Sequence, residues 1–142
     1  MNKIIYIAGS QHSGTTLLNI ILGGHSQLVG LGEVFQLLRR KGNGFFLTEK
    51  LGDDCSCGAR VSECAFWGPV STRLHADPDI SLAKRYQIVR EVFHEHFGPG
   101  PVIVDSSKLL HYLELLANSS NTDLCTILLT KDARAHCISQ ID

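Results

Sequence analysis

The chain has 142 residues, of which 44% are hydrophobic and 19% are charged, a composition that fits one soluble globular domain with its own core. The formal net charge of −1 excludes a nucleic-acid binder that works through a broadly basic surface, so an anion site must be built locally. We find no apolar stretch long enough to span a membrane and no pattern of a secretory signal, and we therefore expect a cytoplasmic protein.

The N-terminal stretch predicts a strand, a glycine-bounded loop and a helix in immediate succession. Residues 4–8 are an apolar run typical of a buried strand, the loop runs from Gly9 to Gly14, and a helix begins near Thr15. This order aims backbone N–H groups and the positive end of a helix dipole at one point, where a phosphate or sulfate oxygen is stabilised. The spacing of the two glycines is that of a P-loop, but Thr15 stands where a nucleoside triphosphatase carries its lysine. We therefore expect an anion cradle that does not hydrolyse ATP or GTP.

The segment after this helix predicts few regular elements. Residues 25–32 read as a glycine-rich connector and residues 34–40 as a short helix. Residues 42–80 have no clear period and are interpreted as an irregular excursion within a single domain that spans residues 1–142. They contain the cysteines at 55, 57 and 64, which lack an obvious fourth ligand, so no metal is expected and a compact, redox-sensitive turn is the interpretation. A zinc site completed by His75 is the alternative.

The C-terminal half alternates helices and strands. We predict an amphipathic helix over residues 81–97, capped by Asp79 or Ser81, then a strand, a helix, a strand and a helix over residues 102–105, 109–117, 124–130 and 133–141. Cys125 is expected in the core of the second of these strands. Alternating strands and helices imply right-handed crossovers, and hence a three-layer α/β fold with helices on both faces of a parallel sheet.

Ligands of such sheets bind at the carboxyl ends of the strands, where three loops should converge. These loops supply cations and hydroxyls suited to a polyanion. The cations are His12, Lys108, Lys131 and Arg134, and the hydroxyls are those of Ser13, Thr15, Thr16, Ser106, Ser107 and Ser139. Asp105 ends the strand before Lys108 and is expected either to cap its neighbours or to bind a metal.

Several motifs resemble those of one enzyme family in family order. The run Gly9-Ser10-Gln11-His12-Ser13-Gly14-Thr15-Thr16 resembles the 5′-phosphosulfate loop of sulfotransferases that use 3′-phosphoadenosine 5′-phosphosulfate (PAPS). Residues 128–139 resemble their 3′-phosphate motif. Gly32-Glu33, the cysteine-containing residues 55–67 and the Val-Asp-Ser-Ser-Lys of residues 104–108 resemble segments of bacterial members. The resemblance covers nearly all of the chain.

This resemblance implies a role for each matching residue. It implies that the 5′-phosphosulfate is held by the first loop, through Gly9, Gln11, His12, Ser13, Gly14, Thr15 and Thr16. It implies that the 3′-phosphate is held by Lys131 and Ser139, with Arg134 as a neighbour. The catalytic residues are expected to be His12 at the position of a family cation, Glu33 as general base, and Lys108. Three positions depart from the family pattern, because it usually has arginine at Lys131, proline at Ala133, and arginine or lysine at His12.

The expected function is transfer of a sulfuryl group from PAPS to a hydroxyl or amine of a small-molecule, carbohydrate or peptide acceptor, without a metal. Neither nucleic acid nor membrane is expected as a partner. The alternatives are a P-loop nucleoside triphosphatase or kinase and an inactive nucleotide-binding fragment. The chain stops inside the helix that follows the 3′-phosphate motif, so the resemblance predicts a C-terminally truncated P-loop nucleotide-binding domain. An exposed sheet edge in such a domain favours a homodimer.

Overall fold

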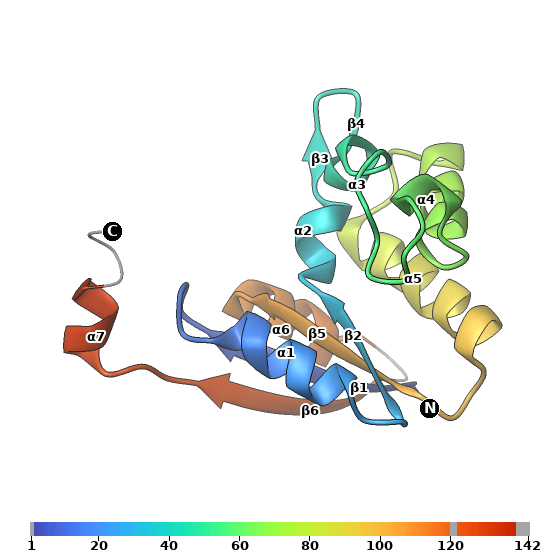
Figure 1. Cartoon of the computed structure of the whole chain (residues 1–142). Helices are drawn as coiled ribbons and strands as arrows, with labels where there is room; N and C mark the ends of the chain where they lie inside the picture. The colour runs from blue at the N-terminus through green and yellow to red at the C-terminus, as the bar shows by residue number, and fades with distance from the viewer. Residues whose placement is uncertain (1, 120–121, 139–142) are drawn as a thin grey trace. The chain divides into compact units, whose positions relative to one another are not determined.

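A computed structural model describes residues 2–119 and 122–138 of the chain (Figure 1). The chain divides into two compact units. The sheet unit comprises Met1–Val34 and Pro101–Asp142, and the helical unit comprises Phe35–Gly100. Across the described residues, no helix combines the length and the apolar character that a membrane span requires.

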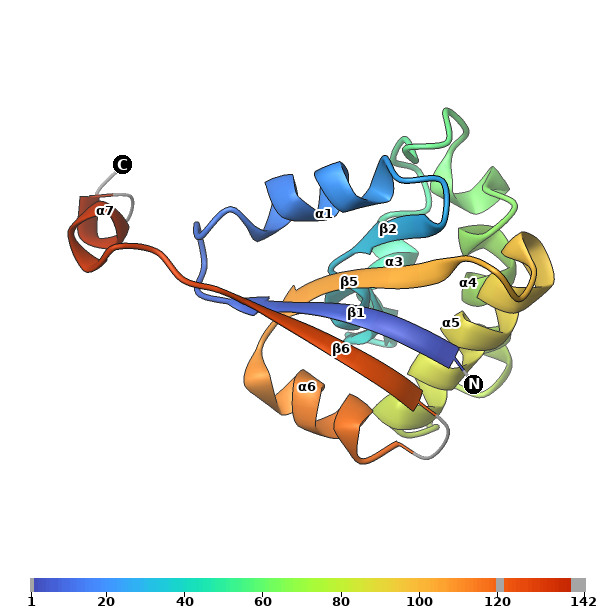
Figure 2. The ribbon, with the colours of Figure 1, turned by 90° about the horizontal axis from the view of Figure 1, so that it is seen from below.

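The sheet unit contains a parallel sheet with the strand order β2-β5-β1-β6. Its strands are β1 (Asn2–Gly9), β2 (Leu28–Gly32), β5 (Val102–Lys108) and β6 (Thr122–Leu129). Its helices are α1 (Thr15–Gly23), α6 (Leu110–Ala117) and α7 (Ala133–Ile138). Figure 2 shows α1 and α6 on opposite faces of the sheet. The predicted α/β class with a parallel sheet is confirmed.

The two central strands, β1 and β5, form the core of the sheet unit. Their apolar runs are buried because a parallel strand inside a sheet has both faces covered. The fully or almost fully buried residues are Ile4, Tyr6, Ile7, Ala8, Ile103 and Val104. The prediction of a buried first strand from its apolar run is therefore confirmed.

The strand β2 corrects the prediction of a connector over residues 25–32. It pairs in parallel with β5, and Gly30 lies opposite Val104. The buried side chain of Asn19 on α1 donates a hydrogen bond to the carbonyl oxygen of Val104 at 3.2 Å. A Cβ atom at Gly30 would lie 2.6 Å from Oδ1 of Asn19, so glycine is required where the helix approaches the strand. The glycines that suggested a connector thus allow close packing of a strand.

The strand β6 lies at an edge of the sheet, and several of its side chains are exposed. Cys125 is exposed, so the prediction that it lies in the core is wrong. Leu128 is 66% exposed. Within the described chain β6 pairs only with β1, which leaves one row of backbone groups unpaired. An apolar run alone did not distinguish an edge strand from a central one.

The helical unit has its own core of aromatic and aliphatic side chains. Its elements are α2 (Val34–Leu38, which begins at the boundary), β3 (Arg40–Lys41), β4 (Gly44–Phe45), α3 (Phe46–Glu49), a 3₁₀ turn (Val61–Glu63), α4 (Trp67–Ala76) and α5 (Leu82–Phe97). Phe35 stacks on Tyr86 with ring centroids 4.6 Å apart. Ser81 caps α5 by accepting a hydrogen bond from the backbone N–H of Lys84 at 3.3 Å. Residues 42–80 therefore contain regular structure, notably α4, where the sequence predicted an irregular excursion.

Candidate functional site

A cavity of about 310 Å³ lies at the carboxyl ends of β1 and β5 in the sheet unit. It is lined by the loop after β1, the first residues of α1 and the last residue of β5. These lining residues are Gln11, His12, Gly14, Thr15, Thr16 and Lys108. Each was predicted as a site residue, and parallel pairing of β1 with β5 brings the two segments together.

Glycines at both ends of the loop give it its shape. A Cβ atom at Gly9 would lie 2.7 Å from the carbonyl oxygen of Leu129 and 2.9 Å from Oγ of Ser13, so the loop folds tightly against β6. Gly14 is the N-terminal cap of α1 and has a φ of 93°, a left-handed conformation that favours glycine. The P-loop spacing thus places glycine where the backbone requires it.

The hydroxyl of Ser13 is used within the loop. It donates a hydrogen bond to the carbonyl oxygen of Ser10 at 2.7 Å. Ser13 is not among the residues that line the cavity, whereas Thr15 and Thr16 are. Ser13 therefore holds the turn, and the threonines at the start of α1 face the cavity.

Two residues of the cavity have an unusual backbone. His12 has a φ of 58° and Lys108 a φ of 69°, and in the described chain these are the residues other than glycine with positive φ. Such conformations cost about 1–3 kcal/mol each and cluster at functional sites. Their meeting in one cavity identifies it as the candidate site independently of any motif.

Lys108 forms an ion pair with Glu33. Its Nζ lies 2.5 Å from Oε1 of Glu33, and the two side chains are 16% and 39% exposed. Glu33 directly follows β2, after Gly32 with a φ of 72°. The structure therefore places the predicted base, Glu33, in contact with a residue that lines the cavity.

The exit of β5 is fixed by Asp105. This buried carboxylate accepts hydrogen bonds through Oδ1 from the backbone N–H of Ser107 at 2.8 Å and from its hydroxyl. Of the two expected roles, capping its neighbours is the one that these contacts support. These bonds fix the backbone of β5 at Ser107, the residue before Lys108.

Of the predicted 3′-phosphate residues, Lys131 contacts the loop. Its Nζ donates a hydrogen bond to the carbonyl oxygen of His12 at 3.1 Å. Arg134 has a side chain that is 91% exposed and pairs with Asp132 at 3.3 Å, outside the residues that line the cavity. Ser139 lies outside the described residues.

A buried tyrosine beneath the site was missed by the sequence reasoning. The hydroxyl of Tyr6 donates a hydrogen bond to the carbonyl oxygen of Leu109 at 2.8 Å, which fixes the turn between β5 and α6. Burial, followed by the nearby Asp105, raises the pKa of Tyr6 well above its ordinary value. The sequence contains one sign of this role, because Tyr6 is the only residue with a hydroxyl in an otherwise aliphatic run.

The cavity has the chemistry of an oxyanion site. The N-terminus of α1 presents backbone N–H groups, Thr15 and Thr16 add hydroxyls, and Lys108 adds a positive charge. Glu33 is not among the lining residues, but its ion pair with Lys108 holds a carboxylate that can accept a proton next to this wall of the cavity.

We compared the chain with known proteins to test these assignments. No protein-family model, curated protein or solved structure matches it.

Proposed function

We propose that the chain is a PAPS-dependent sulfotransferase whose P-loop-type cavity holds the 5′-phosphosulfate. The observation that carries this proposal is the arrangement around the loop after β1. The loop has P-loop spacing with Thr15 in place of lysine, and Lys108 from the neighbouring strand lines the same cavity. Backbone N–H groups, hydroxyls and one ammonium suit a sulfuryl or phosphate group.

The proposed reaction is an in-line displacement at sulfur. A hydroxyl or amine of the acceptor attacks the sulfur atom, and the bond from sulfur to the bridging oxygen of PAPS breaks. The electron pair of that bond passes to the leaving phosphate of 3′,5′-adenosine bisphosphate. Positioning of the two reactants and stabilisation of the charge on the leaving oxygen are the main contributions a protein can make.

In this proposal the carboxylate of Glu33 accepts the proton of the acceptor. Lys108 donates a hydrogen bond to the leaving oxygen. His12 also lines the cavity and occupies the position where the family usually has a cation. We assign the positive charge of the site to the ammonium of Lys108, a compact cation at the end of β5, and a hydrogen bond to His12.

A triphosphatase is less well supported by the same cavity. The P-loop lysine that contacts the β and γ phosphates is replaced by Thr15. Asp105, the carboxylate at the end of β5, uses Oδ1 for hydrogen bonds from Ser107. These features favour a transferred group whose negative charge is stabilised by protein side chains without a metal ion.

Transfer of radioactive sulfur from ³⁵S-labelled PAPS to a panel of phenols, hexosamines and amines tests the proposal. We expect labelled product with the full chain, and a Glu33→Gln variant should lower kcat more than the affinity for the nucleotide. Mg²⁺-dependent ATP hydrolysis without transfer from PAPS would support a triphosphatase instead. Nucleotide binding without transfer to any acceptor would support the inactive fragment.

A further inference from the structure

The helical unit contains a cluster of cysteine thiols that has no part in the cavity of the sheet unit. The sulfur atoms of Cys55, Cys57 and Cys64 all lie within 4.8 Å of one another. Those of Cys55 and Cys64 are 3.6 Å apart, and all three are free thiols. The three side chains therefore lie together in the structure, in the segment that the sequence predicted to be a compact turn.

The backbone between residues 51 and 64 holds this cluster in place. The N–H of Gly58 donates to the carbonyl oxygen of Cys55 at 2.9 Å, and the N–H of Cys55 donates to that of Ala59 at 2.8 Å. Gly58 has a φ of 89°, which favours glycine and returns the chain so that Cys57 lies beside Cys55. The 3₁₀ turn that ends at Glu63 then presents Cys64.

A backbone N–H group also points at one of the sulfur atoms. The backbone nitrogen of Trp67 lies 3.4 Å from Sγ of Cys64 and donates a hydrogen bond to it. A donor directed at sulfur stabilises a thiolate, which is the form that binds metals.

We propose that Cys55, Cys57 and Cys64 bind one zinc ion through three thiolates. A zinc–sulfur distance of about 2.3 Å in a tetrahedral site places the sulfur atoms about 3.8 Å apart. The 3.6 Å between Cys55 and Cys64 is close to that separation.

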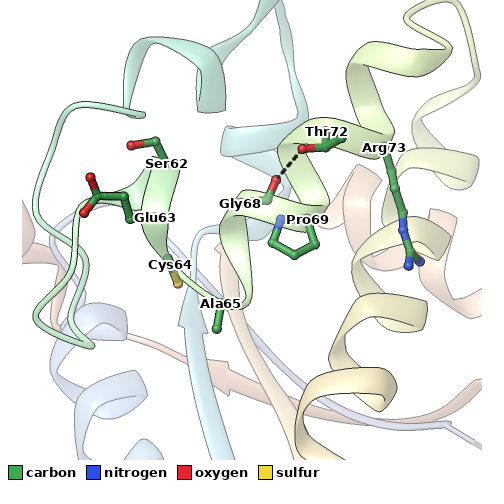
Figure 3. Close-up of a pocket in the computed structure, with 8 residues that line it drawn as sticks. All are labelled: Ser62, Glu63, Cys64, Ala65, Gly68, Pro69, Thr72 and Arg73. Atoms are coloured by element: carbon green, nitrogen blue, oxygen red, sulfur yellow. Dashed lines mark hydrogen bonds between the residues drawn. The ribbon is translucent and has the colours of Figure 1, made fainter.

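The fourth position of this zinc ion is open to water or another external ligand. His75, the fourth ligand considered from the sequence, is occupied elsewhere, with Nδ1 2.6 Å from the carbonyl oxygen of Ser71 and Nε2 3.1 Å from Oγ1 of Thr48. Figure 3 shows the carboxylate of Glu63 directed away from the sulfur of Cys64. In the part of the chain that the structure describes, no histidine, cysteine or acidic side chain joins the three thiols.

An external ligand has room beside this site. A cavity of about 530 Å³ in the helical unit is lined by residues 62–65 and by α4 residues that include Gly68 and Arg73. Cys64 therefore belongs both to the thiol cluster and to the wall of this cavity (Figure 3). Zinc sites with three protein ligands and an open position are those that bind and activate small molecules.

Metal titration of the full chain tests this proposal. The chain is prepared without an affinity tag, stripped of metal, reduced, and titrated with Zn²⁺ in competition with a chromophoric chelator. We expect one equivalent of zinc to bind, and Co²⁺ in its place should give thiolate charge-transfer absorption and tetrahedral ligand-field bands. A chain that takes no zinc from the chelator would overturn the proposal.

Substitutions at two exposed cysteines separate this site from adventitious binding. Cys57 is exposed, so Cys57→Ser should keep the fold, which far-ultraviolet circular dichroism checks. This variant should lose more affinity for zinc than the roughly 10–100-fold that removal of an outer-shell partner costs. The matched control Cys125→Ser, at an exposed cysteine of the sheet unit, should bind zinc as the unmodified chain does. Equal zinc affinity in both variants, whether high or low, would refute the site.

Discussion

Replacement of Gly9 by alanine tests whether the shape of the loop controls the cavity. The backbone of Gly9 lies outside the left-handed region, so the cost of the added methyl group comes from crowding alone. The new Cβ atom would lie 2.7 Å from the carbonyl oxygen of Leu129, a backbone atom that cannot rotate away. Overpacking of this kind costs about 1–3 kcal/mol. Alanine also restricts the unfolded chain more than glycine does, which offsets about 0.4–1 kcal/mol of this cost. The net loss in the free energy of unfolding is therefore about 1–2 kcal/mol.

This loss should lower the midpoint of thermal unfolding by about 2–8 °C, because each kcal/mol corresponds to about 2–4 °C for a chain of this size. Displacement of the loop should also weaken binding of 3′,5′-adenosine bisphosphate by about tenfold or more, which corresponds to about 1.4 kcal/mol. The matched control is Gly52→Ala, where an added Cβ atom meets no atom within 4 Å. That control should be neutral or slightly stabilising. Calorimetry that finds the same midpoint and the same affinity for both variants would refute the reasoning.

Three further substitutions give separate tests. Lys108→Met should weaken binding of 3′,5′-adenosine bisphosphate about 10–100-fold in a calorimetric titration, because a charged hydrogen-bond donor is lost, whereas Lys3→Met on the same sheet should leave it unchanged. Tyr6→Phe should cost about 0.5–1.5 kcal/mol in urea unfolding at neutral pH through loss of the bond to Leu109. Burial raises the pKa of Tyr6 in the folded state, so above about pH 10 the unfolded chain ionises this phenol first and the unmodified protein loses stability. The difference in unfolding free energy between the unmodified chain and Tyr6→Phe should therefore shrink above that pH. A difference that stays constant with pH would contradict this. We expect the chain to self-associate through its exposed edge strand, and Leu128→Lys should weaken this association in sedimentation velocity. A monomeric unmodified chain, or an association that the substitution leaves unchanged, would contradict this.

The elements that the sequence predicted well are those set by local pattern. The strand β1, the loop from Gly9 to Gly14 and the start of α1 at Thr15 follow from an apolar run, a glycine spacing and a helix start. The helix α5 follows from apolar residues at helical spacing with Ser81 as its cap. Each of these patterns lies within the element itself or next to it, so the element could be predicted without knowing its partners in the fold.

The strand β2 was missed because its structure depends on partners far along the chain. Its five residues include glycines that resemble a connector, and it becomes a strand by pairing with β5. The exposure of Cys125 has a similar cause, since the position of β6 at the sheet edge is a property of strand order. Local propensity carries no information about either feature.

The cavity residues were predictable because the carboxyl ends of neighbouring parallel strands meet. The sequence could not show that His12 and Lys108 have positive φ, or that Lys108 pairs with Glu33, because these features depend on how the loops pack. It also predicts that Ser13 and Arg134 bind the ligand, which stays a prediction; their side chains contact Ser10 and Asp132 in the structure. The motif thus indicated which loop lines the cavity but not which of its side chains do so.

Calorimetric titration of the full chain with 3′,5′-adenosine bisphosphate, compared with ATP in the presence of Mg²⁺, tests the central claim most directly. We expect saturable binding of the bisphosphate that EDTA does not change, and no competition by Mg²⁺ and ATP. Tighter binding of ATP with Mg²⁺ than of the bisphosphate, or no binding of the bisphosphate by a chain that is folded by circular dichroism, would contradict the claim that this cavity holds a phosphosulfate nucleotide.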